Sequence, residues 1–100
     1  MHEIDEVNLM SGFIQKTVVL GDLIRIKLPE APETGNLENW IINAFPDQDS
    51  PIQMLHQRFE TTNGTGKKIL TLRANQIGKH EITAFSTWGD IKKFFIEVNE

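Results

Sequence analysis

The chain has 100 residues and a formal net charge of −4, and 39% of its residues are hydrophobic and 24% charged. This length supports one small core, so we expect residues 1–100 to fold as a single globular domain. The acidic balance argues against nucleic acid and anionic membranes as partners, because both need a concentrated positive field. The chain contains no cysteine, which excludes disulfides, thiolate metal sites and a cysteine nucleophile.

The N-terminus does not have the pattern of a targeting segment. Residues 1–6 are acidic, whereas a signal peptide begins with basic and then apolar residues. No apolar run approaches the ~20 residues of a membrane-spanning helix. We therefore expect a soluble, unprocessed chain that is intracellular by default, although a chain without cysteine is compatible with export as well.

The first third of the chain predicts a β-hairpin. Residues 7–9 fit a short opening strand before a turn at residues 11–12. Residues 13–20 are rich in β-branched and aromatic side chains, and residues 23–28 alternate apolar with charged side chains, which are both strand patterns. Residues 21–22, Gly-Asp, form the expected turn between them. The side chains expected in the core here are Ile14, Val18 and Val19.

The stretch 29–35 is predicted to end the second strand of this hairpin with a stiff loop. Pro29 and Pro32 lack a backbone donor and have a fixed φ, and Gly35 can take a positive φ. We therefore do not expect these residues to continue a sheet ladder. Rigid loops on regular scaffolds often carry binding, and the alternative is an ordinary solvated turn.

Residues 36–45 are compatible with two structures. Their apolar side chains recur at helical spacing, as Leu37, Trp40, Ile41 and Ala44, and at strand spacing, as Trp40, Ile42 and Ala44. The run is short and lies between a glycine and a proline, among other predicted strands. We favour a strand and keep a helix as the alternative.

The rest of the chain predicts four further strands, separated by polar or glycine-bearing turns. They are residues 52–61, 67–74, 80–85 and 91–98. Polar and apolar side chains are mixed on both faces of residues 52–61, which indicates an edge strand or a twisted strand. About seven strands at spacings of roughly ten residues, with no confident helix, predict an all-β, antiparallel β-sandwich of immunoglobulin-like type.

Three loops with unusual composition are expected at one end of this sandwich. If consecutive strands run up and down, the connections 29–35, 61–66 and 86–90 all leave the same end. The first contains two prolines and a threonine, the second Gly-Thr-Gly, and the third Trp88 beside a glycine. Their coincidence favours a binding surface, although a tryptophan in a turn also commonly folds back onto the core.

Several motifs follow one another along nearly the whole chain. They are a strand that begins Gly-Asp-Leu and ends Leu-Pro (21–29), a Pro-x-Thr-Gly loop (Pro32, Glu33, Thr34, Gly35), Trp40, a Gly-x-Gly loop (Gly64, Thr65, Gly66), Gly-Lys-His-x-Ile (78–82) and a loop with Trp88. Each motif is common by itself. The ordered set resembles the chagasin-type inhibitors of papain-like cysteine proteases.

This resemblance implies a reversible, tight-binding inhibitor that fills the cleft of a cathepsin L-type protease with the three loops and is not cleaved. It implies a monomer without cofactor, metal or catalytic residue. The protease-binding residues that it implies are Pro32, Glu33, Thr34, Gly35, Gly64, Thr65, Gly66, Thr87 and Trp88. In this interpretation the loop prolines and glycines restrict the free loops, so that binding loses little entropy, and Trp88 supplies the apolar area of a hot spot.

The sequence also departs from the family pattern. The first loop of the family usually reads Asn-Pro-Thr-Thr-Gly, and here Ala31 and Glu33 replace two of those residues. The last loop usually carries Arg-Pro-Trp, whereas here Ser86 and Thr87 precede the tryptophan. A carboxylate at position 33 attracts an imidazolium and repels a thiolate, so the sign of its effect on a catalytic Cys–His pair stays open.

Catalysis by this chain is not expected. The histidines His2, His56 and His80 show no ligand spacing, and residues 63–68 lack the Gly-x4-Gly-Lys-Ser/Thr pattern of a phosphate loop. The alternative to an inhibitor is a non-catalytic immunoglobulin-like binding or assembly module without inhibitory activity.

Overall fold

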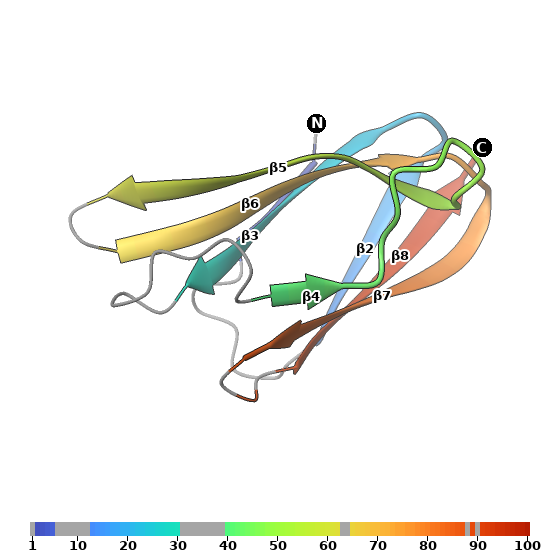
Figure 1. Cartoon of the computed structure of the whole chain (residues 1–100). Coiled ribbons are helices and arrows are strands. Elements are labelled where there is room, and N and C mark those ends of the chain that lie inside the picture. Colours follow the sequence, from blue (N-terminus) through green and yellow to red (C-terminus); the bar gives the residue numbers. More distant parts are fainter. Residues whose placement is uncertain (1, 6–12, 31–39, 63–64, 88, 90) are drawn as a thin grey trace.

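Two four-stranded sheets pack face to face in the computed structural model of the chain (Figure 1). The structure describes residues 2–5, 13–30, 40–62, 65–87, 89 and 91–100. Within these residues the strands are β1 (His2–Asp5), β2 (Phe13–Val19), β3 (Leu23–Glu30), β4 (Trp40–Ile42), β5 (Ile52–Thr62), β6 (Thr65–Ala74), β7 (Gly78–Ser86) and β8 (Ile91–Asn99). The predicted all-β, immunoglobulin-like sandwich is confirmed. In the described part of the chain no helix is long and apolar enough to cross a membrane.

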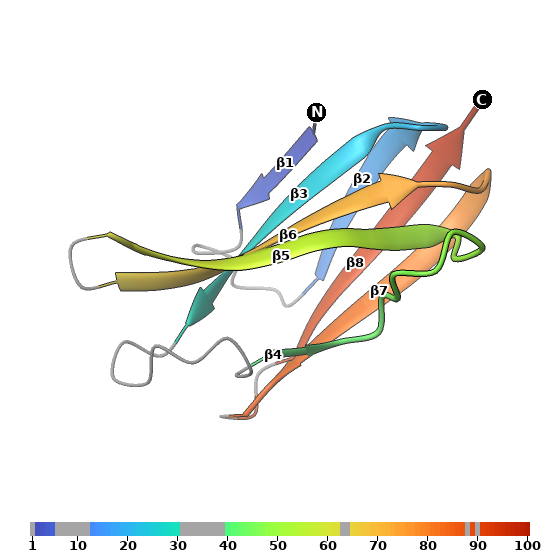
Figure 2. The same cartoon turned by 45° about the horizontal axis from the view of Figure 1, so that its top comes forward.

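The first sheet has the strand order β1-β3-β6-β5 and the second has the order β2-β8-β7-β4 (Figure 2). The central pairs are antiparallel, whereas β1 pairs with β3 and β2 pairs with β8 in parallel. The predicted antiparallel sandwich therefore carries one parallel edge strand in each sheet. Parallel neighbours cannot be joined by a tight turn, and both parallel pairs indeed combine strands that are not consecutive in the chain.

The core lies between the sheets and is formed by alternate residues of the strands. Its buried side chains are Val18, Ile24, Ile26, Leu28, Trp40, Ile52, Leu70, Leu72, Ala74, Ile82, Ala84, Phe94, Ile96 and Val98. Val18 is part of this core and Ile14 packs against it, as predicted. Val19 is 48% exposed, because Val18 occupies the inward position at the end of β2. Since each strand buries one face, a slip of one residue would expose the core, and this fixes the register.

The turn at residues 20–22 is present as predicted, but the strands on either side of it do not form a hairpin. β2 belongs to the second sheet and β3 to the first. The turn crosses between the sheets and is tied to both, because the Leu20 N–H donates to Asn99 O at 2.7 Å and the Gly21 N–H donates to Ala74 O at 2.8 Å. The hairpin prediction is wrong, since alternation and a turn signal identify two strands and a reversal but not the sheet that each strand joins.

Strand β3 continues through Pro29 and Glu30, so the prediction that residues 29–35 do not continue a ladder is wrong for the first two of them. Both residues pair with the start of β6. The described residues of β1 end opposite Lys27, so within the described part of the chain the proline has a strand on one side only, and sheets tolerate proline at such positions. Residues 31–35 of the predicted loop lie outside the described residues.

The loop predicted at residues 61–66 is the tip of a long β-hairpin. Strand β5 extends to Thr62 and β6 starts at Thr65, and these two residues pair with each other. The Thr/Asn/Gly composition correctly predicted a chain reversal, but the predicted loop of 61–66 was too long. Two paired strands need only a short connection, and here the strands include Thr61, Thr62, Thr65 and Gly66. The predicted edge position of β5 is confirmed.

The strand interpretation of residues 36–45 is confirmed for Trp40–Ile42, which form β4. Trp40 is buried, Ile41 is exposed and Ile42 is half-buried, which is the alternation of a strand. Residues 36–39 lie outside the described residues, as does the strand expected at residues 7–9. Strand β1 was not predicted, because the composition of its residues indicated only an acidic N-terminus.

Candidate functional site

The strands that flank the three predicted loops meet at one end of the sandwich, which we call the loop end (Figures 1 and 2). It comprises the ends of β3, β5 and β7 and the starts of β4, β6 and β8. Across the first sheet, Glu30 pairs with Gly66, and Gly66 pairs with Thr61 on its other side. In the second sheet, Trp40 at the start of β4 pairs with Ser86 at the end of β7. The bases of the predicted loops are therefore neighbours.

The structure places some of the predicted binding residues and leaves the others as predictions. Gly66 is buried in the ladder between β3 and β5, Thr65 is the first residue of β6, and Thr87 is exposed in the turn directly after β7. The remaining predicted residues, Pro32, Glu33, Thr34, Gly35, Gly64 and Trp88, lie outside the described residues. The loops thus have defined bases, and the roles of their tips stay predictions.

The connection between β7 and β8 turns sharply at Gly89. This glycine has a φ of +98°, a conformation that other residues rarely adopt, and its N–H donates to Ser86 O at 3.2 Å. Nothing lies within 4 Å of the position that a β-carbon would take. The backbone conformation and not lack of space therefore favours glycine here, beside the exposed Thr87.

A buried lysine joins the two sheets at the loop end. Lys68 on β6 is 5% exposed, and its Nζ donates a hydrogen bond to Trp40 O at 3.3 Å. The indole of Trp40 belongs to the core, so the tryptophan that follows the first predicted loop packs inside the sandwich. The start of β4 is consequently held both by its side chain and by its carbonyl oxygen.

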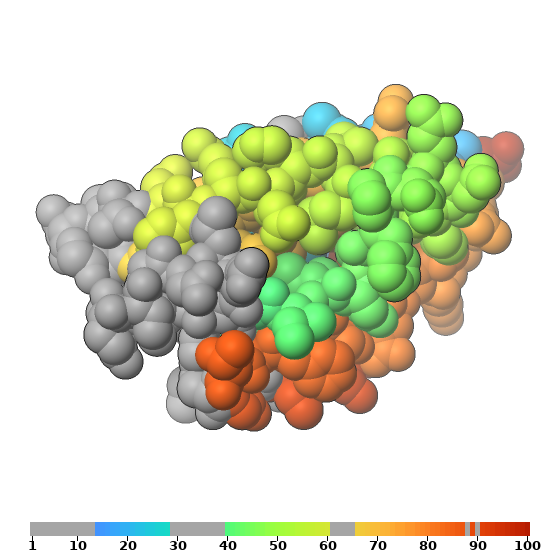
Figure 3. Space-filling model, viewed as in Figure 1, coloured from blue at the N-terminus to red at the C-terminus, as the bar shows by residue number. Residues whose placement is uncertain are grey.

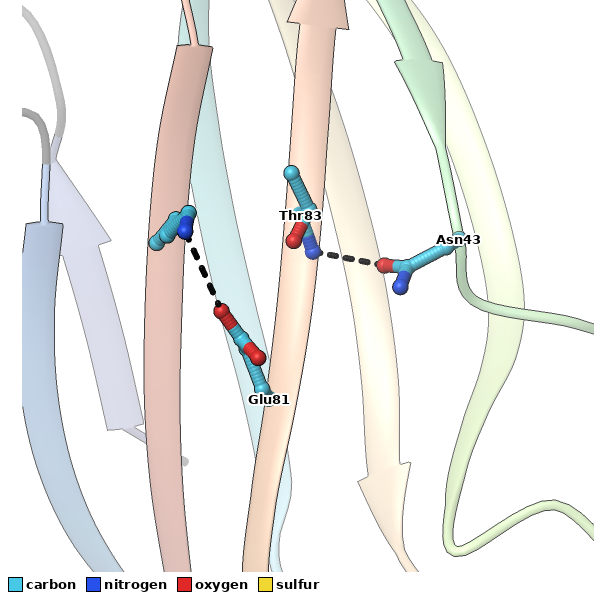
Figure 4. Close-up of polar contacts among 4 residues, drawn as sticks. Asn43, Glu81 and Thr83 are labelled. Carbon is cyan, nitrogen blue, oxygen red and sulfur yellow. Dashed lines mark hydrogen bonds and ion pairs between the residues drawn. The ribbon is translucent and has the colours of Figure 1, made fainter.

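The other end of β4 is fixed by Asn43, as Figure 4 shows. The Asn43 N–H donates to Thr83 O at 3.1 Å, and the Thr83 N–H donates to Asn43 Oδ1 at 2.6 Å. The side-chain oxygen thus replaces a backbone carbonyl and continues the ladder with β7 past the end of β4. The nearby ion pair of Lys93 and Glu81 at 3.7 Å is half exposed, and such pairs contribute little stability.

Three exposed apolar side chains, Ile41, Phe85 and Ile91, form what we call the apolar row. They pair directly across β4, β7 and β8, so they share the outer face of the second sheet, and they are 68%, 45% and 50% exposed. Figure 3 shows the surfaces of β4 (green) and of the end of β7 (orange-red) side by side at this position. Alternation in the sequence puts Phe85 on the strand face opposite Ile82 and Ala84, but only the pairing between strands reveals the row.

Two further features of the described surface are a groove between the sheets and a contact of His80. A groove of about 910 Å³ lies between the edge strands β4 and β5 and is lined by Trp40, Ile42, Met54 and Lys68 among others. His80 Nε2 lies 2.8 Å from Gln76 O, close to the turn between β6 and β7. Within the described ranges, no three histidine or acidic side chains gather in a way that could hold a metal ion.

Comparisons with known proteins bear on the fold. No family model matches the chain, and a comparison with curated proteins finds no match. The crystal structure of a cysteine protease inhibitor from Entamoeba histolytica matches with a TM-score of 0.70 and 15% identity, over 98% of this chain and 94% of that chain. The solution structure of amebosin matches with a TM-score of 0.51 and 19% identity, over 99% and 97% of the two chains. In fold, this chain is therefore similar to a cysteine protease inhibitor, as the motif order predicted.

Proposed function

We propose that this protein is a reversible, tight-binding inhibitor of papain-like cysteine proteases. The observation that carries the proposal is the structural match to a cysteine protease inhibitor over nearly the full length of both chains. The order of the sequence motifs and the common end of the strands that flank the three loops support it. The partner is a cathepsin L-type enzyme, and the inhibitor acts as a monomer.

In the proposed complex two of the loops, 29–35 and 61–66, leave adjacent strands of the first sheet. Their bases are the paired residues Glu30, Gly66 and Thr61. Neighbouring strands lie about 4.8 Å apart, so the ladder sets the separation of these loops before the protease is met. An arrangement formed in advance loses little conformational entropy on binding, which favours high affinity.

The third loop, 86–90, comes from the second sheet. In the proposed complex it enters the protease cleft beside the two loops of the first sheet. Trp88 is its apolar anchor, since a large aromatic residue at the centre of an interface commonly contributes the most binding energy. The apolar row begins directly beside this loop, because Phe85 and Ile91 flank it in sequence. The row would add apolar contact area on the outer face of the second sheet.

The chain resists cleavage because its first loop is constrained at both ends. The loop leaves from Glu30 in the β3–β6 ladder, and β4 starts at Trp40, which is held by the core and by Lys68. Attack on a peptide bond requires the scissile carbonyl to reach a near-attack geometry, which a constrained loop reaches less readily than a free peptide. Thr34 and neighbouring backbone groups approach the catalytic Cys–His pair without becoming substrate.

Titration of active-site-quantified papain and cathepsin L with the purified protein tests the proposal. We expect loss of protease activity at one molar equivalent, recovery on dilution, and an inhibitor that mass spectrometry shows to be intact. A protein that leaves both enzymes active at micromolar concentration, or that is consumed as a substrate, would overturn the proposal. That result would favour the non-catalytic immunoglobulin-like module.

A further inference from the structure

Lys68 occupies an inward position on a central strand of the sandwich. It alternates with Leu70 and Leu72, which are fully buried, and is itself only 5% exposed. An ammonium group loses hydration when it is buried, so an apolar side chain of similar length would fill this position at lower cost. The packing of the core therefore does not account for the charge.

The contact made by the Lys68 ammonium reaches across to the other sheet. Its Nζ donates to Trp40 O at 3.3 Å, and Trp40 is the first residue of β4. In its own sheet Lys68 pairs with Leu28 of β3, two residues before Glu30, where β3 ends. Lys68 thus lies beside β3, which leads into residues 31–39, and its side chain bonds to β4, which follows them.

Strand β4 needs such external support. It has only three residues, and in the described structure it pairs with β7 alone. Strands this short are not stable by themselves. The reciprocal hydrogen bonds of Asn43 and Thr83 hold its end, and the bond from Lys68 holds its start.

We propose that Lys68 is a positioning residue for protease binding: its ammonium fixes the start of β4 relative to β3 and β6. It thereby sets the distance between Glu30 and Trp40, the residues on either side of residues 31–39. This inference rests on the proposed function of the loop end. The positive charge serves the geometry of binding, and the stability of the sandwich does not depend on it.

Replacement of Lys68 by methionine separates these two roles. Lys68→Met keeps an unbranched side chain of similar length and removes the donor and the charge. We expect a Tm close to that of the wild type, because the apolar methionine side chain fills the buried position and offsets the lost hydrogen bond. We also expect at least tenfold faster hydrogen exchange at the β4 amides of residues 40–43, and about tenfold weaker inhibition. The matched control is Lys79→Met, which removes the same charge from an exposed position on β7 and should change none of these quantities.

Hydrogen exchange and inhibition are measured on the same samples of wild type, Lys68→Met and Lys79→Met. Unchanged exchange in β4 of Lys68→Met would overturn the proposal whatever the inhibition assay shows, and so would faster exchange with unchanged inhibition. A lowered Tm together with weaker inhibition, repeated in Lys68→Leu, would show a merely structural role and also overturn it. If the wild type itself fails to inhibit, the proposed function falls, whereas β4 exchange still decides whether Lys68 holds this strand.

Discussion

The two ends of the sandwich are built in different ways. At the end opposite the loop end, which we call the anchored end, the turns 20–22, 46–51 and 75–77 are tied to one another. The Gly21 N–H donates to Ala74 O and the Ala74 N–H donates to Asp22 O, which ties turn 20–22 to the end of β6. Asn75 ties the turn at 75–77 to turn 46–51 and the start of β5: its N–H donates to Pro51 O, and its Nδ2 donates to Gln48 O, Ser50 O and Gln53 Oε1. At the loop end, a bond from Lys68 Nζ to Trp40 O joins the described residues of the two sheets.

We expect stability and binding to be located at opposite ends of the molecule. The anchored end and the core between the sheets hold the fold, so the loop end can carry residues chosen for contact with a partner. Substitutions at the anchored end should lower the free energy of unfolding and leave inhibition intact. Substitutions at the loop end should do the reverse, and four variants test this division.

The largest effect on stability is expected in the core. Phe94 is fully buried between the sheets, so Phe94→Ala should lower the free energy of unfolding by about 3–5 kcal/mol, measured by chemical denaturation. Phe95, its outward-facing neighbour, supplies the matched control, and Phe95→Ala should cost much less. Equal losses in the two variants would contradict the assigned register of β8.

The largest effect on inhibition is expected at Trp88. Trp88→Ala should raise the inhibition constant at least tenfold, which corresponds to about 1.4 kcal/mol or more, because the indole is the proposed apolar anchor. The free energy of unfolding should change by less than about 0.5 kcal/mol, as for other surface substitutions. A large loss of stability without loss of inhibition would show that the indole belongs to the core.

Asn75 should show the opposite behaviour. Its side-chain amide donates hydrogen bonds to three oxygen atoms of the anchored end, at 3.3, 3.4 and 2.9 Å. Asn75→Ala should therefore lower the free energy of unfolding by about 0.5–1.5 kcal/mol, because hydrogen bonds between exposed or half-buried groups are lost. The inhibition constant of the folded variant should stay within about a factor of two of the wild-type value, because Asn75 lies far from the proposed binding loops. A difference of that size is within the usual error of inhibition assays. If fully folded Asn75→Ala inhibits more weakly than the wild type, the assignment of stability and binding to opposite ends is wrong.

The smallest effect is expected at the apolar row. Phe85→Ser should weaken inhibition about threefold, since contacts around a hot spot contribute less than the hot spot itself. Phe45→Ser is the control, because Phe45 is also strongly exposed but lies after β4, away from the loop end. Equal inhibition constants for the two variants would remove the apolar row from the contact surface.

The sequence predicted the strands well because most of them bury one face. Alternation identified residues 80–85 and 91–98 as strands, and they form most of β7 and β8. It could not give the partner of each strand, which is why a hairpin was expected at 13–28 where the chain crosses between the sheets. Pairing is decided by burial over the whole fold, and a short window of sequence does not contain that information.

For the candidate site, the sequence predicted the positions of the loops but not the contacts that hold the strands around them. The composition of 29–35, 61–66 and 86–90 correctly indicated chain reversals at one end. The loop at 61–66 proved shorter than expected because β5 and β6 extend into it, and β3 includes the first two residues of 29–35. The bond from Lys68 to Trp40 had no sequence signal, since the two residues are far apart along the chain and lysine usually indicates an exposed position.

Mapping the bound surface by NMR tests the assignment of binding to the loop end most directly. Isotope-labelled protein is titrated with a papain-like protease whose catalytic cysteine has been replaced by alanine. We predict that the largest chemical-shift changes fall in residues 29–35, 61–66 and 86–90, and that residues 20–22 and 75–77 keep their free-state shifts. Changes concentrated in the turns of the anchored end would contradict this assignment.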